Sequence, residues 1–386
     1  MKEKVQAPQL RFDGFTDDWE ERKLEEWSLV LTGFPFKNED FVDNGKYLVI
    51  TNGNIQNESS IVDVSLGNRV DDLSDEIKER YYLNKNDILV TMDGTVGRTA
   101  KVVDDNMILA QRVARLVANK NTEFVYQLLN QGSFFNEMKK VSHGGTIKHI
   151  SLNEISNYSA TVPSNDIEQQ KIGLFFKQLD NTIALHQRKL DLLKEQKKGY
   201  LQKMFPKNGA KVPELRFAGF ADDWELRKLD KIVDIHSGKD YKHLNEGNIP
   251  VYGTGGYMLS VSEALSEKND AIGIGRKGTI DKPYLLKAPF WTVDTLFYAT
   301  PQKNTDLQFT LAIFKKINWK KYDESTGVPS LSKTVINNVS TFLPGFKEQE
   351  KIGSFFKQVD NTIDLHQRKL DLLKEQKKGF LQQMFV

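Results

Sequence analysis

The sequence of 386 residues contains no cysteine and only six histidines. Without cysteine it can form neither a disulfide nor a thiolate zinc site, and so few histidines make metal catalysis a poor expectation. No apolar run approaches the roughly 18 residues of a membrane-spanning helix. The start, MKEKVQAPQLRFDGF, lacks the apolar segment of a signal peptide. These absences predict a cytoplasmic protein without a membrane partner.

Common catalytic motifs are also missing. There is no P-loop, no H-E-x-x-H and no G-x-S-x-G. Residues 273–278 match G-x-G-x-x-G after an apolar run, but a strand-like segment follows where a dinucleotide site needs a helix. Residues 281–284, DKPY, differ by one residue from the D-P-P-Y motif of amino-group methyltransferases, and no glycine-rich cofactor loop precedes them. We therefore expect no catalytic residue, no metal and no cofactor bound by this chain.

The sequence does contain a long duplication. Residues 168–205 and 348–385 are identical at 32 of 38 positions, and both include LDLLKEQKKG. A shorter repeat, PxLRFxGFxDDWExRKL, opens each half at 8–24 and 213–229. Duplicated segments predict duplicated architecture. The order of head, variable block and long repeat therefore occurs twice.

The long repeats predict two helices, each with one apolar seam. Apolar residues recur at spacings of three and four, no proline interrupts them, and 38 residues make a helix about 57 Å long. An apolar stripe has to be buried, and a nearly identical stripe lies in the same chain. We predict an antiparallel coiled coil about a pseudo-two-fold axis; the alternative is that each stripe pairs with a helix of another protein. The predicted helix–helix interface consists of Phe176, Leu179, Ile183, His186, Leu190, Leu193, Phe356, Val359, Ile363, His366, Leu370 and Leu373.

Two features of these helices allow more than one interpretation. The seam histidines, His186 and His366, are interpreted as polar residues that fix the helix register, with a metal or pH-switch site as the alternative. The KEQKK runs at 194–198 and 374–378 are interpreted as a solvated or partner-binding surface, with phosphate contact as the alternative. The two long repeats carry 15 basic and 10 acidic residues, against 39 and 42 elsewhere. A polyanion site therefore has to be a local cluster.

The variable blocks, residues 20–163 and 225–344, differ in sequence but share a pattern. Short β-branched runs separated by Gly, Asn and Asp predict strands. Amphipathic stretches at 123–140 and 306–321 predict one helix in each block. We predict an α+β fold in which each block is a mixed α/β domain with a strongly twisted or barrel-like sheet. The predicted strand segments are KYLVI, DILVTM, TAKVV and RVARLV in the first block, and IPVY, AIGI, PYLL and TLFYA in the second.

Loops rich in Gly, Thr, Arg and Lys connect these strands. Their backbone N–H groups and small hydroxyls suit close approach to phosphates, and nearby Arg and Gln can read base edges. The alternative is ordinary hairpin turn chemistry. The candidate DNA-binding residues are Thr91, Arg98, Gln111, Arg112, Lys148, Lys239, Arg276, Lys277 and Lys282.

The duplicated head, the GTVGR turn at 94–98, the E-Q-x-K-I-G start of each long repeat and the LDNTI…HQRKLDLLKEQKKG helix together resemble the specificity subunit of type I restriction–modification systems. The resemblance covers nearly the whole chain. It implies that each variable block is a target-recognition domain and that the paired helices separate the two. It predicts four segments: recognition domain 1 at 1–163, a central helix at 164–206, recognition domain 2 at 207–344 and a C-terminal helix at 345–386.

The resemblance also implies partners. The expected complex contains double-stranded DNA, two methyltransferase subunits and two restriction and translocase subunits. S-adenosylmethionine, ATP and Mg²⁺ are expected on those subunits, which methylate adenine N6 or cut DNA, while this chain is a non-catalytic reader of a bipartite, asymmetric site. Two other interpretations remain at this stage: a solitary methyltransferase, against which the missing cofactor loop argues, and a coiled-coil adaptor that does not touch DNA.

Overall fold

The structure, a computed structural model, describes residues 7–56, 59–207 and 209–386. The chain forms two compact units. Unit 1 comprises Met1–Gln187 and Lys369–Val386, and unit 2 comprises Arg188–Arg368. Each unit therefore contains one variable block and a part of both long helices. The sequence predicted four segments in which each long helix stands by itself. In the structure each compact unit instead includes a part of both long helices.

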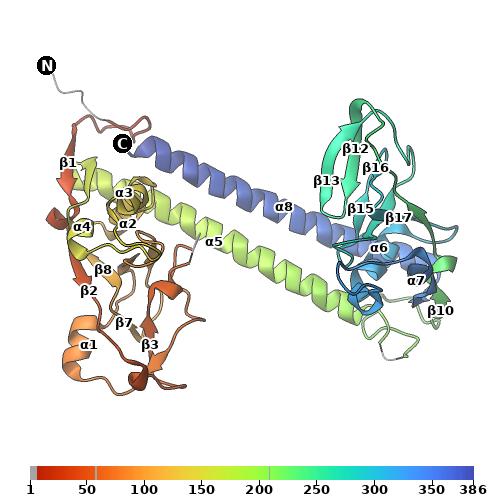
Figure 1. The fold of residues 1–386 in the computed structure, drawn as a ribbon, viewed down its shortest axis with the longest axis horizontal. Helices are drawn as coiled ribbons and strands as arrows, with labels where there is room; N and C mark the ends of the chain where they lie inside the picture. The colour runs from red at the N-terminus through yellow and green to blue at the C-terminus, as the bar shows by residue number, and fades with distance from the viewer. Residues whose placement is uncertain (1–6, 57–58, 208) are drawn as a thin grey trace. The chain divides into compact units, whose positions relative to one another are not determined.

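Unit 1 contains three small sheets (Figure 1). An antiparallel sheet of four strands has the order β2-β8-β5-β6, and a three-stranded sheet has the order β4-β3-β7 with β3 and β7 parallel. β1 and β9 form a separate antiparallel ribbon. The strands are β1 (Trp19–Lys23), β2 (Ser28–Thr32), β3 (Tyr47–Ile50), β4 (Arg69–Val70), β5 (Ile88–Thr91), β6 (Thr99–Lys101), β7 (Met107–Leu109), β8 (Val113–Ala118) and β9 (Ser159–Pro163).

Unit 2 repeats this topology strand for strand. Its four-stranded sheet is β11-β17-β14-β15, its three-stranded sheet is β13-β12-β16 with β12 and β16 parallel, and β10 pairs with β18. The strands are β10 (Glu225–Lys228), β11 (Val233–Ser237), β12 (Glu246–Gly253), β13 (Gly256–Val261), β14 (Ala271–Gly275), β15 (Tyr284–Leu286), β16 (Trp291–Thr292), β17 (Leu296–Pro301) and β18 (Ser340–Leu343). The prediction of a common fold beneath two divergent blocks is confirmed.

The shorter helices correct one expectation. The stretch 123–140 is not one helix but two, because the chain turns at Gly132, whose φ of 106° lies in the left-handed region. In unit 2 the helix ends at Lys316, and a 3-10 turn then buries the Trp319 ring, whose indole N–H donates to the Phe314 carbonyl. The helices are α1 (Asp75–Tyr81), α2 (Thr122–Leu129), α3 (Ser133–Val141), α4 (Leu152–Ser156), α6 (Leu307–Lys316) and α7 (Lys333–Asn338), with 3-10 turns at Leu24–Glu26, Asn38–Asp40, Asn52–Asn54, Leu229–Lys231 and Trp319–Tyr322.

The two long repeats are helices, α5 (Asp166–Lys203) and α8 (Phe346–Met384). Within unit 1 the parts of α5 and α8 run antiparallel. Phe175 and Phe176 contact Phe380 and Phe385, respectively, with ring centroids 5.1 and 6.0 Å apart. The Asp180 carboxylate accepts an ion pair from Lys377 at 2.7 Å. All members of the predicted interface are buried or half-buried, as the heptad pattern requires.

Unit 2 contains the same arrangement with the roles of the helices exchanged. Phe355 and Phe356 of α8 contact Tyr200 and Phe205, respectively, and the Asp360 carboxylate pairs with Lys197. Each contact repeats one of unit 1 with every residue number changed by 180. The two helix pairs thus obey the internal symmetry that the duplication predicts.

The head repeat joins the two helices in each unit. The Arg11 guanidinium donates to both carboxylate oxygens of Glu168 at 2.6 and 2.8 Å, and Arg216 does the same to Glu348 at 2.7 and 2.8 Å. Both glutamates are almost completely buried. The hydrogen bonds to Glu168 raise the pKa of Arg11, so the guanidinium stays charged. The head therefore fixes the start of one long helix in each unit.

The head also contacts the end of the other helix. The Leu10 amide donates to the Gln383 carbonyl of α8 at 2.8 Å, and the Leu215 amide donates to the Lys203 carbonyl of α5 at 2.8 Å. None of the described helices is long and apolar enough to cross a membrane.

Candidate nucleic-acid interface

Three loops of unit 1 meet at one end of its four-stranded sheet. They are residues 92–98 between β5 and β6, 110–112 between β7 and β8, and 142–150 before α4; together we name them the unit 1 loop cluster. Backbone hydrogen bonds hold them together, because the Met92 amide donates to the Arg112 carbonyl at 3.2 Å and the Gly94 amide donates to the Lys148 carbonyl at 2.8 Å. The cluster is thus a defined surface and not a set of separate hairpin turns.

Unit 2 builds the same frame from residues 276–282, 293–295 and 323–331, the unit 2 loop cluster. The Arg276 amide donates to the Thr295 carbonyl at 2.8 Å, and the Gly278 amide donates to the Pro329 carbonyl at 2.8 Å. These bonds correspond one by one to those of unit 1. They align the two clusters although their sequences differ.

The aligned frames carry different side chains. An isolated bridge joins Asp93 to His149 in unit 1, and the corresponding bridge in unit 2 joins Lys277 to Ser330. Arg112, whose carbonyl accepts the first backbone bond, corresponds to Thr295. The acidic position of one cluster is thus basic in the other, so the two surfaces differ in charge at this position.

Arg112 has the most unusual conformation of the unit 1 cluster. Its φ is 77°, in the left-handed region of the backbone that residues other than glycine rarely adopt. Its side chain is 59% exposed. Asp93 faces it, with 3.8 Å between the carboxylate and the guanidinium Nε, and Asp93 also hydrogen-bonds His149 Nδ1 at 2.8 Å. A strained, exposed and buttressed arginine is typical of a functional position.

Two basic residues of the unit 2 cluster, Arg276 and Lys277, line a cavity of about 420 Å³. Both are exposed, and the Arg276 guanidinium lies over the Phe297 ring at 5.8 Å. Lys333 and Glu324 also line the cavity. Arg276 Nη1 donates to the Asp294 carbonyl at 3.4 Å, and an arginine stacked on an aromatic ring can offer its other N–H donors to a planar partner.

The structure separates the predicted DNA-binding residues into three groups. Gln111, Arg112 and Lys148 are exposed in the unit 1 cluster. Lys239 is exposed just after β11, where its backbone pairs with Thr292 and Trp291. In the unit 2 cluster, the predicted residues Arg276, Lys277 and Lys282 are all exposed.

Two predicted residues have other surroundings. Thr91 is only 2% exposed, and its hydroxyl donates to the Thr95 carbonyl at 2.6 Å and accepts from the Arg98 amide. It shapes the loop and does not offer a hydroxyl to a ligand, because a strand ending in a sheet core buries its last residue. Arg98 lines a cavity shared with α8.

Sequence reasoning missed Asp93 and His149 of the unit 1 cluster, and also Lys333, which lies just beyond the unit 2 cluster. Asp93 directly precedes the GTVGR turn, but an acidic side chain is not expected to contact a polyanion. The pairing of Asp93 with His149 spans 56 positions and has no local signal.

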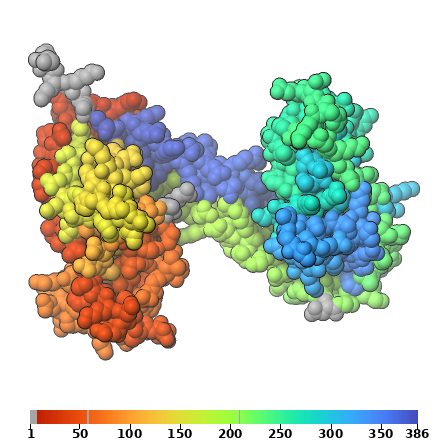
Figure 2. All heavy atoms as spheres, in the orientation of Figure 1, coloured from red at the N-terminus to blue at the C-terminus, as the bar shows by residue number. Residues whose placement is uncertain are grey.

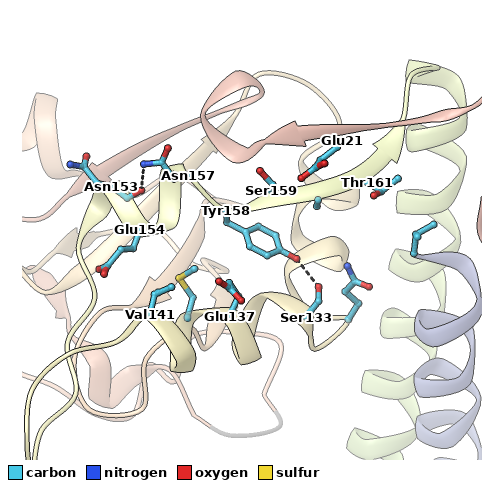
Figure 3. Close-up of a pocket in the computed structure, with 14 residues that line it drawn as sticks. Glu21, Ser133, Glu137, Val141, Asn153, Glu154, Asn157, Tyr158, Ser159 and Thr161 are labelled. Atoms are coloured by element: carbon cyan, nitrogen blue, oxygen red, sulfur yellow. Dashed lines mark hydrogen bonds between the residues drawn. The ribbon is translucent and has the colours of Figure 1, made fainter. Parts of the chain in front are cut away.

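A second cavity in unit 1 has the opposite charge (Figure 3). Its volume is about 570 Å³, and Glu21, Glu137 and Glu154 line it. At its centre the Tyr158 hydroxyl lies 2.6 Å from the Ser133 hydroxyl, and burial raises the pKa of Tyr158, which therefore stays neutral. Carboxylates repel phosphates, so this cavity is a poor nucleic-acid site. Among the described residues, no cluster of His, Asp and Glu is arranged to hold a metal ion.

Comparison with known proteins identifies the family. The model of the "Type I restriction modification DNA specificity domain" matches residues 16–195 and 221–375. The chain belongs to this family. Each match includes one block and most of the long helix that follows it, so this specificity subunit contains the domain twice.

Individual relatives agree with this assignment. The type I restriction enzyme MjaVIII specificity subunit of Methanocaldococcus jannaschii is 22% identical over 338 residues, which is 78% of each chain. The S subunit of a type I restriction–modification system from M. genitalium has a TM-score of 0.74 at 19% identity and 99% coverage of both chains. A chain from a structure on complex assembly and conformational transition of the type I R-M system has a TM-score of 0.52 at 15% identity, covering 94% of this chain and 96% of that one. These two likenesses establish the fold.

Proposed function

We propose that this specificity subunit reads a bipartite, asymmetric DNA site, one half through each loop cluster. The observation that carries the proposal is the pair of aligned clusters with different side chains, in which Asp93, Arg112 and His149 correspond to Lys277, Thr295 and Ser330. A shared frame suits docking to the same kind of ligand, and different side chains suit different base sequences.

The proposed division of labour leaves the chemistry to other subunits. Two methyltransferase subunits bind the outer faces of α5 and α8, and two restriction and translocase subunits join them. S-adenosylmethionine, ATP and Mg²⁺ belong to those subunits, which methylate adenine N6 or cut DNA. Exposed leucines at Leu185, Leu192, Leu365 and Leu372 support a docking role, because they repeat at heptad spacing on both helices.

The long helices are proposed to act as the spacer. A helix of 38 residues is about 57 Å long, while one turn of DNA is about 34 Å. Two weak readers joined by a stiff connection bind one duplex more tightly than either alone. The bases between the half-sites are then counted by distance and not read.

Substitution of the cluster cations tests the DNA contact. In the complex with methyltransferase subunits, replacement of Arg98, Arg112, Lys148, Arg276 or Lys282 by alanine should lower affinity for a DNA duplex. Where the replaced residue contacts a phosphate, the plot of the logarithm of affinity against the logarithm of salt concentration should also become shallower, by roughly one unit of slope. The measurement is a mobility-shift titration at several salt concentrations.

The control is an exposed cation at the opposite ends of the strands that carry the unit 1 cluster. Lys85 precedes β5 and pairs at 3.1 Å with Asp105, which precedes β7, whereas the cluster loops follow these two strands. Lys85→Ala should therefore leave DNA affinity unchanged. Unchanged affinity for all five cluster variants would reject the placement of the interface. Absence of DNA binding by the unaltered complex would favour the adaptor interpretation.

A further inference from the structure

In unit 1 the last turns of α8 lie beside α2 and α3 (Figures 1 and 2). A basic cavity lies between these elements. Its volume is about 480 Å³. Four of its lining residues are cationic, and no aspartate or glutamate is among the described residues that line it. The cations are Arg98, Lys374, Lys377 and Lys378.

Three of these cations are available to a ligand. Lys377 is committed to Asp180 at 2.7 Å, and Gln127 donates to the same carboxylate at 2.8 Å. Arg98, Lys374 and Lys378 form no ion pair with any described residue. Like charges so close together are unfavourable unless an anion separates them.

The start of α3 adds an independent attraction for an anion. Gly132 precedes this nine-residue helix with a φ of 106°, and no side chain caps it. Gly132 and Phe135 line the cavity, so the first turn of α3 borders it. Uncapped N–H groups carry partial positive charge and bind phosphate oxygens.

We propose that this cavity holds a backbone phosphate of the DNA that the subunit reads. Arg98 ends the loop 92–98 of the unit 1 cluster, so DNA bound there can extend its backbone to the cavity. This inference rests on the proposed function. It also gives one KEQKK run a role in phosphate contact, which the sequence alone leaves open.

The described residues of unit 2 do not repeat this basic lining, although its helix has the same sequence. Asp281 and Lys282 stand where Gly97 and Arg98 stand in unit 1, and the Asp281 carboxylate pairs with Lys320 at 2.8 Å. The hydrogen bond from Lys320 lowers the pKa of Asp281, which keeps it negative. In addition, unit 2 has a 3-10 turn at Trp319–Tyr322 after α6, in the place where unit 1 has the helix α3 after α2. The helix start that borders the cavity in unit 1 is therefore replaced in unit 2. The site is therefore specific to unit 1.

The identical LDLLKEQKKG segments supply a matched control. The test variant is Lys374→Ala with Lys378→Ala, and the control is Lys194→Ala with Lys198→Ala. Each is assembled with methyltransferase subunits and titrated with a duplex that carries the site methylated by the unaltered complex. The test variant should lose roughly tenfold in affinity and about 0.9 units of salt slope, and the control should lose neither.

The methylated sequence provides a second readout. Phosphate contacts position DNA without reading its sequence. The complex that contains the test variant should therefore methylate the same sequence as the unaltered complex, but more slowly. Equal losses in both variants, or a loss of methyltransferase binding measured by sedimentation, would overturn the inference. If the unaltered complex binds no DNA, the proposed function itself fails, which is a distinguishable result.

Discussion

At the scale of single residues, Arg112 connects backbone strain with the proposed recognition of DNA. Its left-handed backbone costs of the order of 1 kcal/mol, and glycine would adopt the same backbone freely. We predict that Arg112→Gly leaves the free energy of unfolding unchanged or raises it by up to about 1 kcal/mol. The same variant should lose about 1–3 kcal/mol of discrimination at one base of one half-site. Denaturant unfolding and methylation mapping measure the two effects.

The control for Arg112 is Asn106, which also lies in unit 1 with a positive φ, of 57°. Asn106→Gly relieves the same kind of backbone conformation without removing a cation. It should leave DNA recognition intact. A relaxed site in the Asn106 variant, or an unchanged site in the Arg112 variant, would show that recognition does not depend on the Arg112 side chain.

The sequence allowed Arg112 and Lys148 to be named as candidates, because basic residues in Gly-rich loops stand out locally, and the structure exposes both. The positive φ of Arg112 and its pairing with Asp93 could not be predicted, because they depend on loops that are far apart in sequence. Thr91 was misjudged since a hydroxyl beside a loop looks accessible until the strand before it is placed in a sheet core.

At the scale of elements, glycines in the same long helix have opposite roles. A methyl group at Gly173 would lie 2.8 Å from the Phe124 amide nitrogen, so α5 can approach the start of α2 only with glycine there. Gly353 repeats this against Asp306 and Phe309 of unit 2. By contrast, no atom of the described residues outside the helix itself lies within 4 Å of a methyl group at Gly199 or Gly379.

Alanine substitution should therefore change stability in opposite directions along one helix. Gly173→Ala should lower the free energy of unfolding by about 1–3 kcal/mol through overpacking. Gly199→Ala should raise it by about 0.5–1 kcal/mol, because alanine favours the helix and meets no obstacle. Urea unfolding of both variants measures the difference, and two changes of the same sign would refute the proposed packing of α5 on α2.

The long helices were predictable because their signal is local and repeated over many turns. Four strands in each block were also predicted from short β-branched runs, and these correspond to β3, β5, β6 and β8 and to β12, β14, β15 and β17. The remaining strands were not predicted. The parallel pairing of β3 with β7 has no local signal because it joins segments more than 50 residues apart. The break at Gly132 was missed since one glycine in an amphipathic stretch does not by itself end a helix.

At the scale of the whole molecule, duplication explains both what is shared and what differs. The head and the long helices keep their sequence because each contact they make occurs twice, as with Arg11–Glu168 and Arg216–Glu348. The loop clusters keep only their backbone frame. Conserved packing around divergent loops is the arrangement expected of one scaffold that presents two different readers.

The most direct test is to map N6-methyladenine in the genome of a cell that expresses this specificity subunit with its methyltransferase. The account predicts one motif made of two unlike half-sites separated by a constant number of unspecified bases. Arg112→Gly should relax only one half-site. A single continuous motif, two identical half-sites, or a spacer of variable length would contradict the account.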